Sequence, residues 1–219
     1  MNLILTLALF VAFIFLLIQG IILANKYGWF KLENTPLLVI LALVYEMFVL
    51  FIGRWVGEGG LLEGLNYVRF WLHALVTPLL ILFSWKSLYR ASFHWVKTAW
   101  LKMVVILLTI ALICYELVTG VLGIKLEPKW EAEILFYENA TEQKFPLMIS
   151  VIFAVIVITG FLLWRKQRWP WLLMGVSVML IGSLTTNWLN LSMFMNVFEW
   201  ILLFSLLCTK KFQDQLHNI

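Results

Sequence analysis

Seven long apolar runs, separated by short polar segments, constrain this chain more than any other feature of its sequence. A helix needs about 20 predominantly apolar residues to cross the hydrocarbon core of a bilayer. A spanning segment must satisfy its own backbone hydrogen bonds in lipid, so runs of this length form helices. We therefore predict an all-α, polytopic integral membrane helical bundle with about seven transmembrane helices. The runs are 3–24, 36–55, 68–85, 98–120, 146–164, 170–186 and 189–208.

The composition leaves room for a membrane domain and little else. Of the 219 residues, 63% are hydrophobic and 13% are charged, whereas soluble domains carry about 25% charged residues. Seven spans of about 20 residues use about 140 positions and leave about 80 for loops and tails. No Lys or Arg precedes Lys26, so we expect the first run to be a retained helix rather than a cleaved signal peptide. We expect one domain, 1–219, that contacts the lipid bilayer as a multi-pass protein of the plasma membrane.

The loop charges predict how the bundle is oriented. Eleven Lys and Arg residues lie around the loops that follow the first, third, fifth and seventh runs, and five lie on the other side. Seven acidic residues lie on the side with fewer basic ones. Because cytoplasmic loops carry the excess of Lys and Arg, this pattern predicts the N-terminus out and the C-terminus in. The basic residues belong to short loops, so the net charge of +4 does not indicate nucleic-acid binding.

Prolines and one long loop break the regular pattern of the runs. Pro36, Pro146 and Pro170 are predicted at helix starts, where a missing N–H is tolerated. Pro78 lies inside the third run and is predicted to kink that helix. The longest loop, about 121–145, is acidic. It is compatible with a short amphipathic helix on the outer surface, with a lid or with a solvated connector.

Seven spans also divide into three, one and three. Segments 1–95 and 146–208 would then form two parallel repeats, with 98–120 as a linker helix. Pro36 and Pro170 each open the middle helix of one triplet. Parallel repeats of this kind occur in transporters. The repeat is a hypothesis drawn from span count and direction, without a family motif.

Three carboxylates are predicted inside the membrane: Glu46, Glu116 and Glu199. A charge near the middle of a bilayer is costly, so each of them is a candidate functional residue. Tyr45 and Tyr115 directly precede two of these acids. A buried carboxyl group favours its neutral form unless it is paired, so these acids are candidates for a proton relay.

Two runs carry polar residues at helical spacing, which places each set on one helix face. We predict that the two faces meet in an outward-opening polar pocket lined by spans two, three, four and seven. The polar residues are Asn66, Arg69, His73 and Thr77 in the third run and Ser192, Asn196 and Glu199 in the seventh, with Asn190 at the outer end of the seventh.

Such a pocket is compatible with three functions. The first is a secondary transporter or permease for a small solute, with proton coupling through the carboxylates and a titratable His73. The second is an enzyme acting on a lipid or isoprenoid, in which Arg69 holds the head group and His73 acts with a Glu as acid and base. The third is a sensor or an accessory subunit of a membrane complex. We expect a small-molecule or lipid ligand, and a homo-oligomer or a partner membrane protein remains open.

Structural roles are alternatives for the same residues. Arg69 could form an interfacial ion pair with Glu58 or Glu63, and His73 could hydrogen-bond a neighbouring helix. Asn196, like Ser192, could serve as a polar contact between helices.

Several familiar chemistries lack their residues here. The last run has no Lys before Lys210, as a retinal-binding protein would need, and His73 is the one histidine inside an apolar run. The two cysteines, Cys114 and Cys208, have no metal-type spacing. We therefore expect no metal site and no cofactor, and we find no hydrolase or phosphate-loop motif.

Overall fold

The computed structural model describes residues 3–140, 146–189 and 194–216. Its main elements are eight α-helices and one pair of strands within those ranges. The helices are α1 (Leu3–Tyr27), α2 (Thr35–Val56), α3 (Gly60–Val76), α4 (Leu80–Arg90), α5 (Ala99–Glu116), α6 (Leu147–Gln167), α7 (Trp171–Leu189) and α8 (Met195–Leu216). The strands are β1 (Leu126–Glu131) and β2 (Ile134–Asn139), and the short helical turns are η1 (Leu32–Asn34), η2 (Thr77–Leu79), η3 (His94–Lys97) and η4 (Leu117–Val121).

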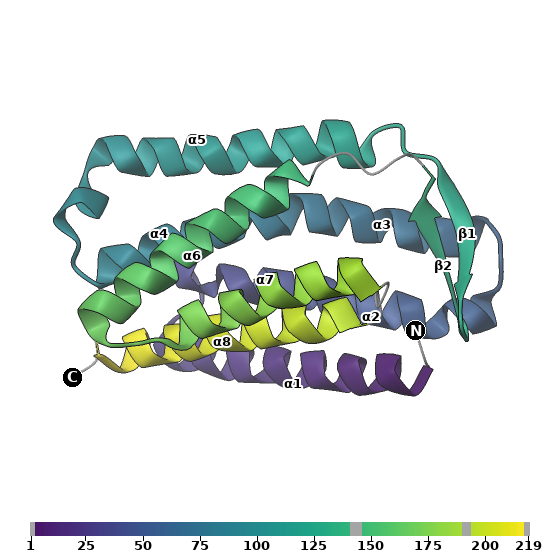
Figure 1. Ribbon diagram of the computed structural model, residues 1–219, viewed down its shortest axis with the longest axis horizontal. Coiled ribbons are helices and arrows are strands. Elements are labelled where there is room, and N and C mark those ends of the chain that lie inside the picture. The colour runs from purple at the N-terminus through teal and green to yellow at the C-terminus, as the bar shows by residue number, and fades with distance from the viewer. Residues whose placement is uncertain (1–2, 141–145, 190–193, 217–219) are drawn as a thin grey trace.

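The helices run back and forth along one long axis (Figure 1). Because η2 joins α3 and α4 into one pass, the described residues make seven helical passes. Five passes are long and apolar enough to cross a membrane, namely α1, η1–α2, α3–α4, α5–η4 and α6. The pass formed by α7 is a shorter apolar helix, and α8 carries charged residues in its second half. The prediction of a multi-pass helical bundle is confirmed at this level, while seven spans and their orientation remain predictions.

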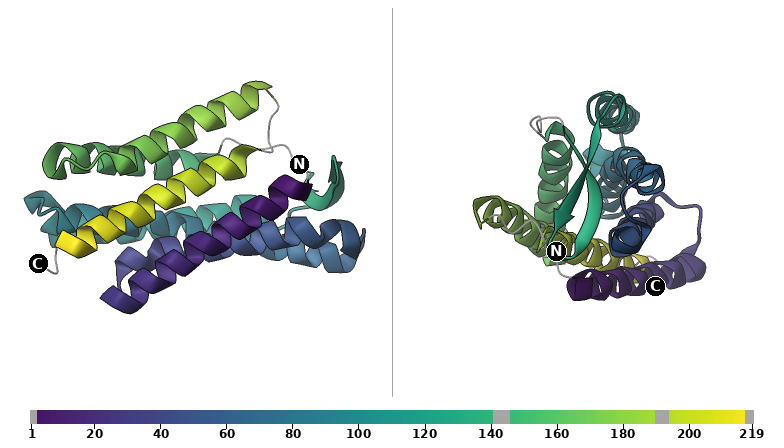
Figure 2. Two further views of the ribbon diagram at one scale, coloured as in Figure 1. Left: turned by 90° about the horizontal axis from the view of Figure 1, so that it is seen from below. Right: turned by 90° about the vertical axis from the view of Figure 1, so that its right-hand side faces the viewer.

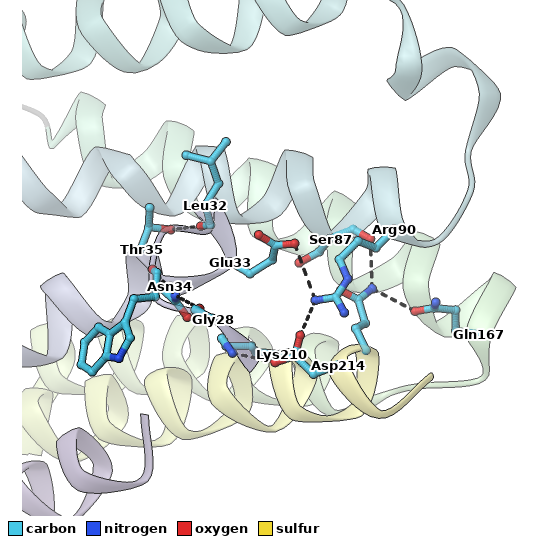
Figure 3. A network of polar contacts seen from close by, with 12 residues as sticks. Gly28, Leu32, Glu33, Asn34, Thr35, Ser87, Arg90, Gln167, Lys210 and Asp214 are labelled. Atoms are coloured by element: carbon cyan, nitrogen blue, oxygen red, sulfur yellow. Dashed lines mark hydrogen bonds and ion pairs between the residues drawn. The ribbon is translucent and has the colours of Figure 1, made fainter. Parts of the chain in front are cut away.

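The two ends of the bundle differ, and we name them by their contents. The hairpin end holds β1 and β2, and the start of α1 lies there as well (Figure 1). The network end holds a group of buried charged residues where α4 and α8 finish (Figure 3). Chain ends lie at opposite ends of the bundle, as an odd number of passes requires (Figure 1).

Prolines mark helix boundaries as predicted. Pro36 lies in the first turn of α2, Pro146 directly precedes α6 and Pro170 directly precedes α7. Pro78 lies in η2, where the third pass changes from α-helix to a 3₁₀ turn and back. A proline removes one helical hydrogen bond and clashes with the preceding turn, which explains the break at this position.

Large apolar side chains cover the outside of the bundle. Such a surface is unfavourable in water over this extent, but it matches the hydrocarbon of a bilayer. Exposed examples on five helices are Val11, Leu41, Ile110, Ile158 and Ile181. The helix lengths and this surface together define a multi-pass membrane protein in contact with lipid.

The core lies between all passes except α5, which contributes little. Phe13, Met47 and Ile156 are fully buried and belong to one continuous apolar core. In α5, by contrast, the buried residues are Thr109 and Leu112. The helix packs along one edge of the bundle and presents most of its surface outward (Figure 1).

The acidic loop forms an antiparallel hairpin, which corrects two predictions. The register runs from Leu126 opposite Asn139 to Glu131 opposite Ile134. The loop is therefore neither an amphipathic helix nor a plain connector, and the chain is not purely α-helical. Ile134 and Leu135 are each 1% exposed, so the second strand is held by burial against helices. Tertiary burial of this kind overrides what local composition suggests.

The hairpin docks on α2 and α3 through a close backbone contact. A Cβ atom added to Gly53 would lie far inside contact distance of the Leu135 carbonyl oxygen, so only glycine fits there. The Gly59 N–H donates a hydrogen bond of 3.0 Å to the Tyr137 hydroxyl, and Trp130 Nε1 donates one of 3.2 Å to Glu58 Oε1. In the right-hand view of Figure 2, the hairpin lies across the end of the bundle.

One ion pair on the hairpin is exposed. The carboxylate of Glu138 accepts a hydrogen bond from Lys129 Nζ, and this bond raises the pKa of the Lys129 amine. The two side chains are 43% and 48% exposed respectively. Exposed pairs contribute little to stability, typically about 0–1 kcal/mol.

Candidate functional site

A cavity of about 90 Å³ lies near the middle of the bundle. Its lining includes four of the charged or titratable residues singled out from the sequence: Glu46, Arg69, His73 and Glu199. They reach it from three passes, because α2 supplies the first, α3 the next two and α8 the last. The remaining wall is mainly apolar and comes from α2, η2, α4, α6, α7 and α8: Val39, Ala42, Leu43, Thr77, Leu80, Ile149, Ile152, Phe153, Met179, Met195, Leu202 and Leu203.

The two carboxylates of the cavity differ in their partners. Glu46 Oε1 lies 3.9 Å from Arg69 Nε, at the outer limit of an ion pair. Glu199 Oε2 is buried and has no hydrogen-bond partner among the described residues. A buried polar atom without a partner is costly and is rare in folded proteins. The free oxygen of Glu199 is therefore the atom of this site that most needs a ligand.

The basic side of the cavity is formed by α3. His73 Nδ1 and Thr77 Oγ1 lie 3.4 Å apart, with the direction of the hydrogen bond set by the tautomer. The Arg69 guanidinium carbon lies 5.3 Å from the centre of the Phe70 ring and 5.8 Å from that of Phe136. Since Phe136 belongs to β2, the hairpin contacts the arginine that lines the cavity.

The charges and size of the cavity restrict its chemistry. When both acids are ionised, two carboxylates face one permanent cation, Arg69, and a second positive charge would balance the site. A cavity of about 90 Å³ leaves room for several waters or for a small solute, since a water occupies about 30 Å³. Carboxylate oxygens accept hydrogen bonds from ammonium groups, and a guanidinium donates to carboxylates.

The fourth span does not line the cavity. Tyr115 and Glu116 lie near the end of α5, at the edge of the bundle. Glu116 instead contacts Gly120 in the π-turn η4, where an added Cβ would lie 2.7 Å from Glu116 Oε1. The fifth pass, α6, takes the expected place with Ile149 and Ile152. Sequence spacing shows which helices carry polar faces, but it does not show which apolar helix packs against them.

Other predicted residues lie near the cavity rather than in its wall. The Tyr45 hydroxyl donates a hydrogen bond of 3.0 Å to the Leu65 carbonyl oxygen and so links α2 to α3. Asn66 is fully buried and donates to the Leu62 carbonyl oxygen. Asn196 Nδ2 lies 3.8 Å from Met47 Sδ, a weak contact between α8 and α2. Asn190 and Ser192 lie outside the described residues.

A second polar group, at the network end, was not anticipated from the sequence. Asp214 Oδ1 lies 2.7 Å from Arg90 Nη1, and its other carboxylate oxygen lies 2.6 Å from Lys210 Nζ. Glu33 Oε1 lies 3.7 Å from the same arginine nitrogen. These four residues, which we call the charge network, join the start of α2 to the ends of α4 and α8 (Figure 3).

The charge network is buried and is extended by amide contacts. The side chains of Lys210 and Asp214 are each 2% exposed. Gln213 Nε2 donates to the Ser87 carbonyl oxygen at 2.9 Å and to Gln167 Oε1 at 3.1 Å. The sequence signals were present: Lys210 and Asp214 are four residues apart, and Glu33 is an acid in an otherwise basic loop. The loop charges counted from the sequence include Arg90 and Lys210, whereas the structure places Arg90 in the last turn of α4 and Lys210 within α8, which continues beyond its apolar run.

Comparison of the chain with protein-family models, with curated proteins and with solved structures finds no match. The class therefore rests on the helices and the cavity alone: a multi-pass membrane protein with an acidic cavity between its helices.

Proposed function

We propose that this protein is a secondary transporter that carries a small cationic or zwitterionic solute, with the cavity as its binding site. The observation that carries this proposal is the buried Glu199 oxygen, which has no partner among the described residues and lies in a cavity that also holds Glu46. A cationic group placed there would offset the charge of Glu199, while Arg69 offsets that of Glu46, and the cost of burying both carboxylates would fall.

Charge balance favours this solute class over an anion. Arg69 offsets one carboxylate, and the long distance of 3.9 Å to Glu46 leaves much of its hydrogen-bonding capacity free. A solute ammonium would be held by Glu199, while a solute carboxylate would be held by Arg69. A zwitterion with both groups therefore uses both sides of the cavity.

The same residues support coupling to protons. A membrane carboxylate that exchanges a proton for a cation can link the two movements. His73 lies in the same wall and offers a second side chain that can carry a proton. Solute binding would then release a proton, so solute and proton would cross in opposite directions, and a proton gradient directed out of a vesicle would drive solute uptake.

Access from one side at a time is the remaining requirement of a transporter. The cavity lies near the middle of the bundle, and the charge network joins η1 to α4 and α8 across the network end. In the proposed orientation the hairpin end faces outward, and the network closes the inner end. Transport would require the ion pairs of Arg90 to separate while the hairpin end closes.

A direct test uses purified protein in proteoliposomes with an imposed pH gradient. Uptake is measured for a panel of small amines, amino acids and dicarboxylates. We expect uptake of at least one amine or amino acid by the wild-type protein and loss of that uptake in Glu46→Gln and Glu199→Gln. Glu63→Gln is the control, because Glu63 is exposed at the hairpin end. Equal uptake in Glu199→Gln, or uptake of dicarboxylates alone, would overturn the proposal.

Lipid chemistry is the alternative that the same cavity must be tested against. Profiling of lipids and metabolites in a strain that lacks the protein separates the two functions. Loss of uptake of one solute supports transport. Accumulation of a lipid intermediate, with uptake unchanged, would instead assign Arg69 and His73 to an enzyme.

A further inference from the structure

A groove between α1 and α8 lies outside the proposed transport site. The two helices run in the same direction and lie side by side (Figures 1 and 2). A groove of about 400 Å³ follows them over the network half of the bundle. It is lined by Phe15, Leu16, Gln19, Ile22, Leu23, Lys26 and Tyr27 of α1 and by Phe204, Leu207, Cys208, Lys211 and Gln215 of α8.

The groove changes character along its length. Toward the middle of the bundle its walls are apolar, with Phe15 53% and Phe204 38% exposed. Toward the network end it carries two lysines, Lys26 and Lys211, both exposed. The structure gives neither lysine an ion pair within its described residues, although Lys26 Nζ lies 5.3 Å from the centre of the Tyr27 ring. An apolar slot that ends in two cations matches the shape of a phospholipid.

The charge network explains why this end is positive at its surface. The acidic residues of this end, within the described ranges, are Glu33 and Asp214, and both are buried against Arg90. Their charges are therefore neutralised inside the protein. The exposed charges at this end of the described chain are basic, and they include Lys26 and Lys211.

Tryptophans place the lysines at the level of the lipid head groups. Lys211 also borders a second groove of about 340 Å³, whose walls include Trp169 and Trp171. Trp169 stacks on Phe212 of α8, with ring centres 4.1 Å apart. Tryptophan prefers the interface between hydrocarbon and water. The two lysines thus lie where a lipid phosphate would lie.

We propose that the groove between α1 and α8 is a binding site for one anionic phospholipid, with Lys26 and Lys211 on its head group and an acyl chain between Phe15 and Phe204. Basic pockets between helices on the cytoplasmic side of membrane proteins bind anionic head groups in this way. The site is independent of the transport function, because it shares no lining residue with the acidic cavity.

The test measures bound lipid on the purified full chain by native mass spectrometry. Phosphatidylglycerol and phosphatidylcholine with the same acyl chains are added in turn to delipidated protein. Two lysines beside a head group of net negative charge predict about a thirtyfold preference for phosphatidylglycerol over the zwitterionic phosphatidylcholine. We expect Lys26→Gln/Lys211→Gln to abolish this preference and Lys26→Arg/Lys211→Arg to retain it.

Lys102→Gln is the matched control, because Lys102 is exposed at the same end on α5 and does not line the groove. It should keep the full preference. Equal binding of the two lipids by the wild-type protein would overturn the proposal without any variant. A preference that survives in Lys26→Gln/Lys211→Gln would also overturn it, because the groove lysines would then not hold the head group. An equal fall in Lys102→Gln would overturn it as well, because lipid binding would then follow the overall charge of the protein.

Discussion

Two buried carboxyl groups on α8 have opposite surroundings. Asp214 has a cation on each of its oxygens, whereas one oxygen of Glu199 has no partner among the described residues. A fully paired buried acid stabilises the packing around it, while an unpaired one is an energetic burden. The contrast separates a structural acid from a candidate binding group.

The paired acid should be sensitive to loss of its charge. Asp214→Asn leaves Lys210 buried without its carboxylate and Arg90 with the more distant Glu33, which should lower the free energy of unfolding by about 3–5 kcal/mol. Chemical denaturation of the purified protein in detergent measures this loss. Glu138→Gln is the control, since it breaks an exposed pair and should cost about 0–1 kcal/mol. Equal effects of the two substitutions would show that the charge network does not stabilise the fold.

The unpaired acid should behave in the opposite way. Glu199→Leu replaces a carboxyl group that lacks a partner with an apolar side chain of similar size, so we expect the free energy of unfolding to rise by about 1–3 kcal/mol. The same variant should lose solute uptake, as expected when a residue serves function at the expense of stability. A clear loss of stability in Glu199→Leu would mean that Glu199 is a structural residue.

At the scale of elements, the apolar runs predicted the helices but not the strands. A run of about 20 apolar residues can satisfy its own backbone hydrogen bonds in lipid as an α-helix, which makes the helices predictable. The hairpin depends on a contact that spacing does not reveal, because Leu135 is buried only where Gly53 lets the strand approach α2.

For the candidate site, the sequence predicted the polar residues of the cavity but not every helix that forms its wall. Helical spacing placed Arg69 and His73 on one face of the third pass, and both line the cavity. It could not assign α6 rather than α5 to the opposite wall, since both helices are apolar and lack a distinguishing face. The charge network was missed for a different reason: its central ion pair joins Arg90 to Asp214, which lie 124 positions apart in the sequence.

The contact at Gly53 gives the hairpin its own test. Gly53→Ala brings a methyl group against the Leu135 carbonyl oxygen, so the strand must move away from α2. Amide hydrogen exchange should become faster at Leu135 and Tyr137, while the helices stay protected. Gly64→Ala is the control, because nothing lies within 4 Å of its added methyl and alanine favours a helix. Unchanged exchange in Gly53→Ala would show that the hairpin is held elsewhere.

At the scale of the whole molecule, the distribution of charge is the main asymmetry. The hairpin end carries most of the acidic residues, and the network end exposes basic ones. This asymmetry is the basis of the proposed orientation with the network end in the cytoplasm. The division into two repeats around α5 stays a prediction.

Orientation can be tested with single cysteines in a variant that lacks Cys114 and Cys208. A membrane-impermeant thiol reagent applied to intact cells should label Glu127→Cys on the hairpin. The same reagent should leave Lys97→Cys, in η3, unlabelled until the cells are opened. The reverse pattern would place the cavity on the cytoplasmic side.

The central claim is that a water-accessible acidic cavity lies within the membrane and opens toward the hairpin end. Two positions on α6 test it most directly, because Ile149 lines the cavity and Ile158 is 56% exposed on the outer surface. Thiol reagents react with the thiolate, which forms in water and not in hydrocarbon. The rate of labelling by an impermeant reagent, applied from outside to Ile149→Cys and Ile158→Cys in the cysteine-free protein, is the measurement. The account predicts rapid labelling of Ile149→Cys and none of Ile158→Cys, whereas labelling of Ile149→Cys no faster than that of Ile158→Cys would contradict it.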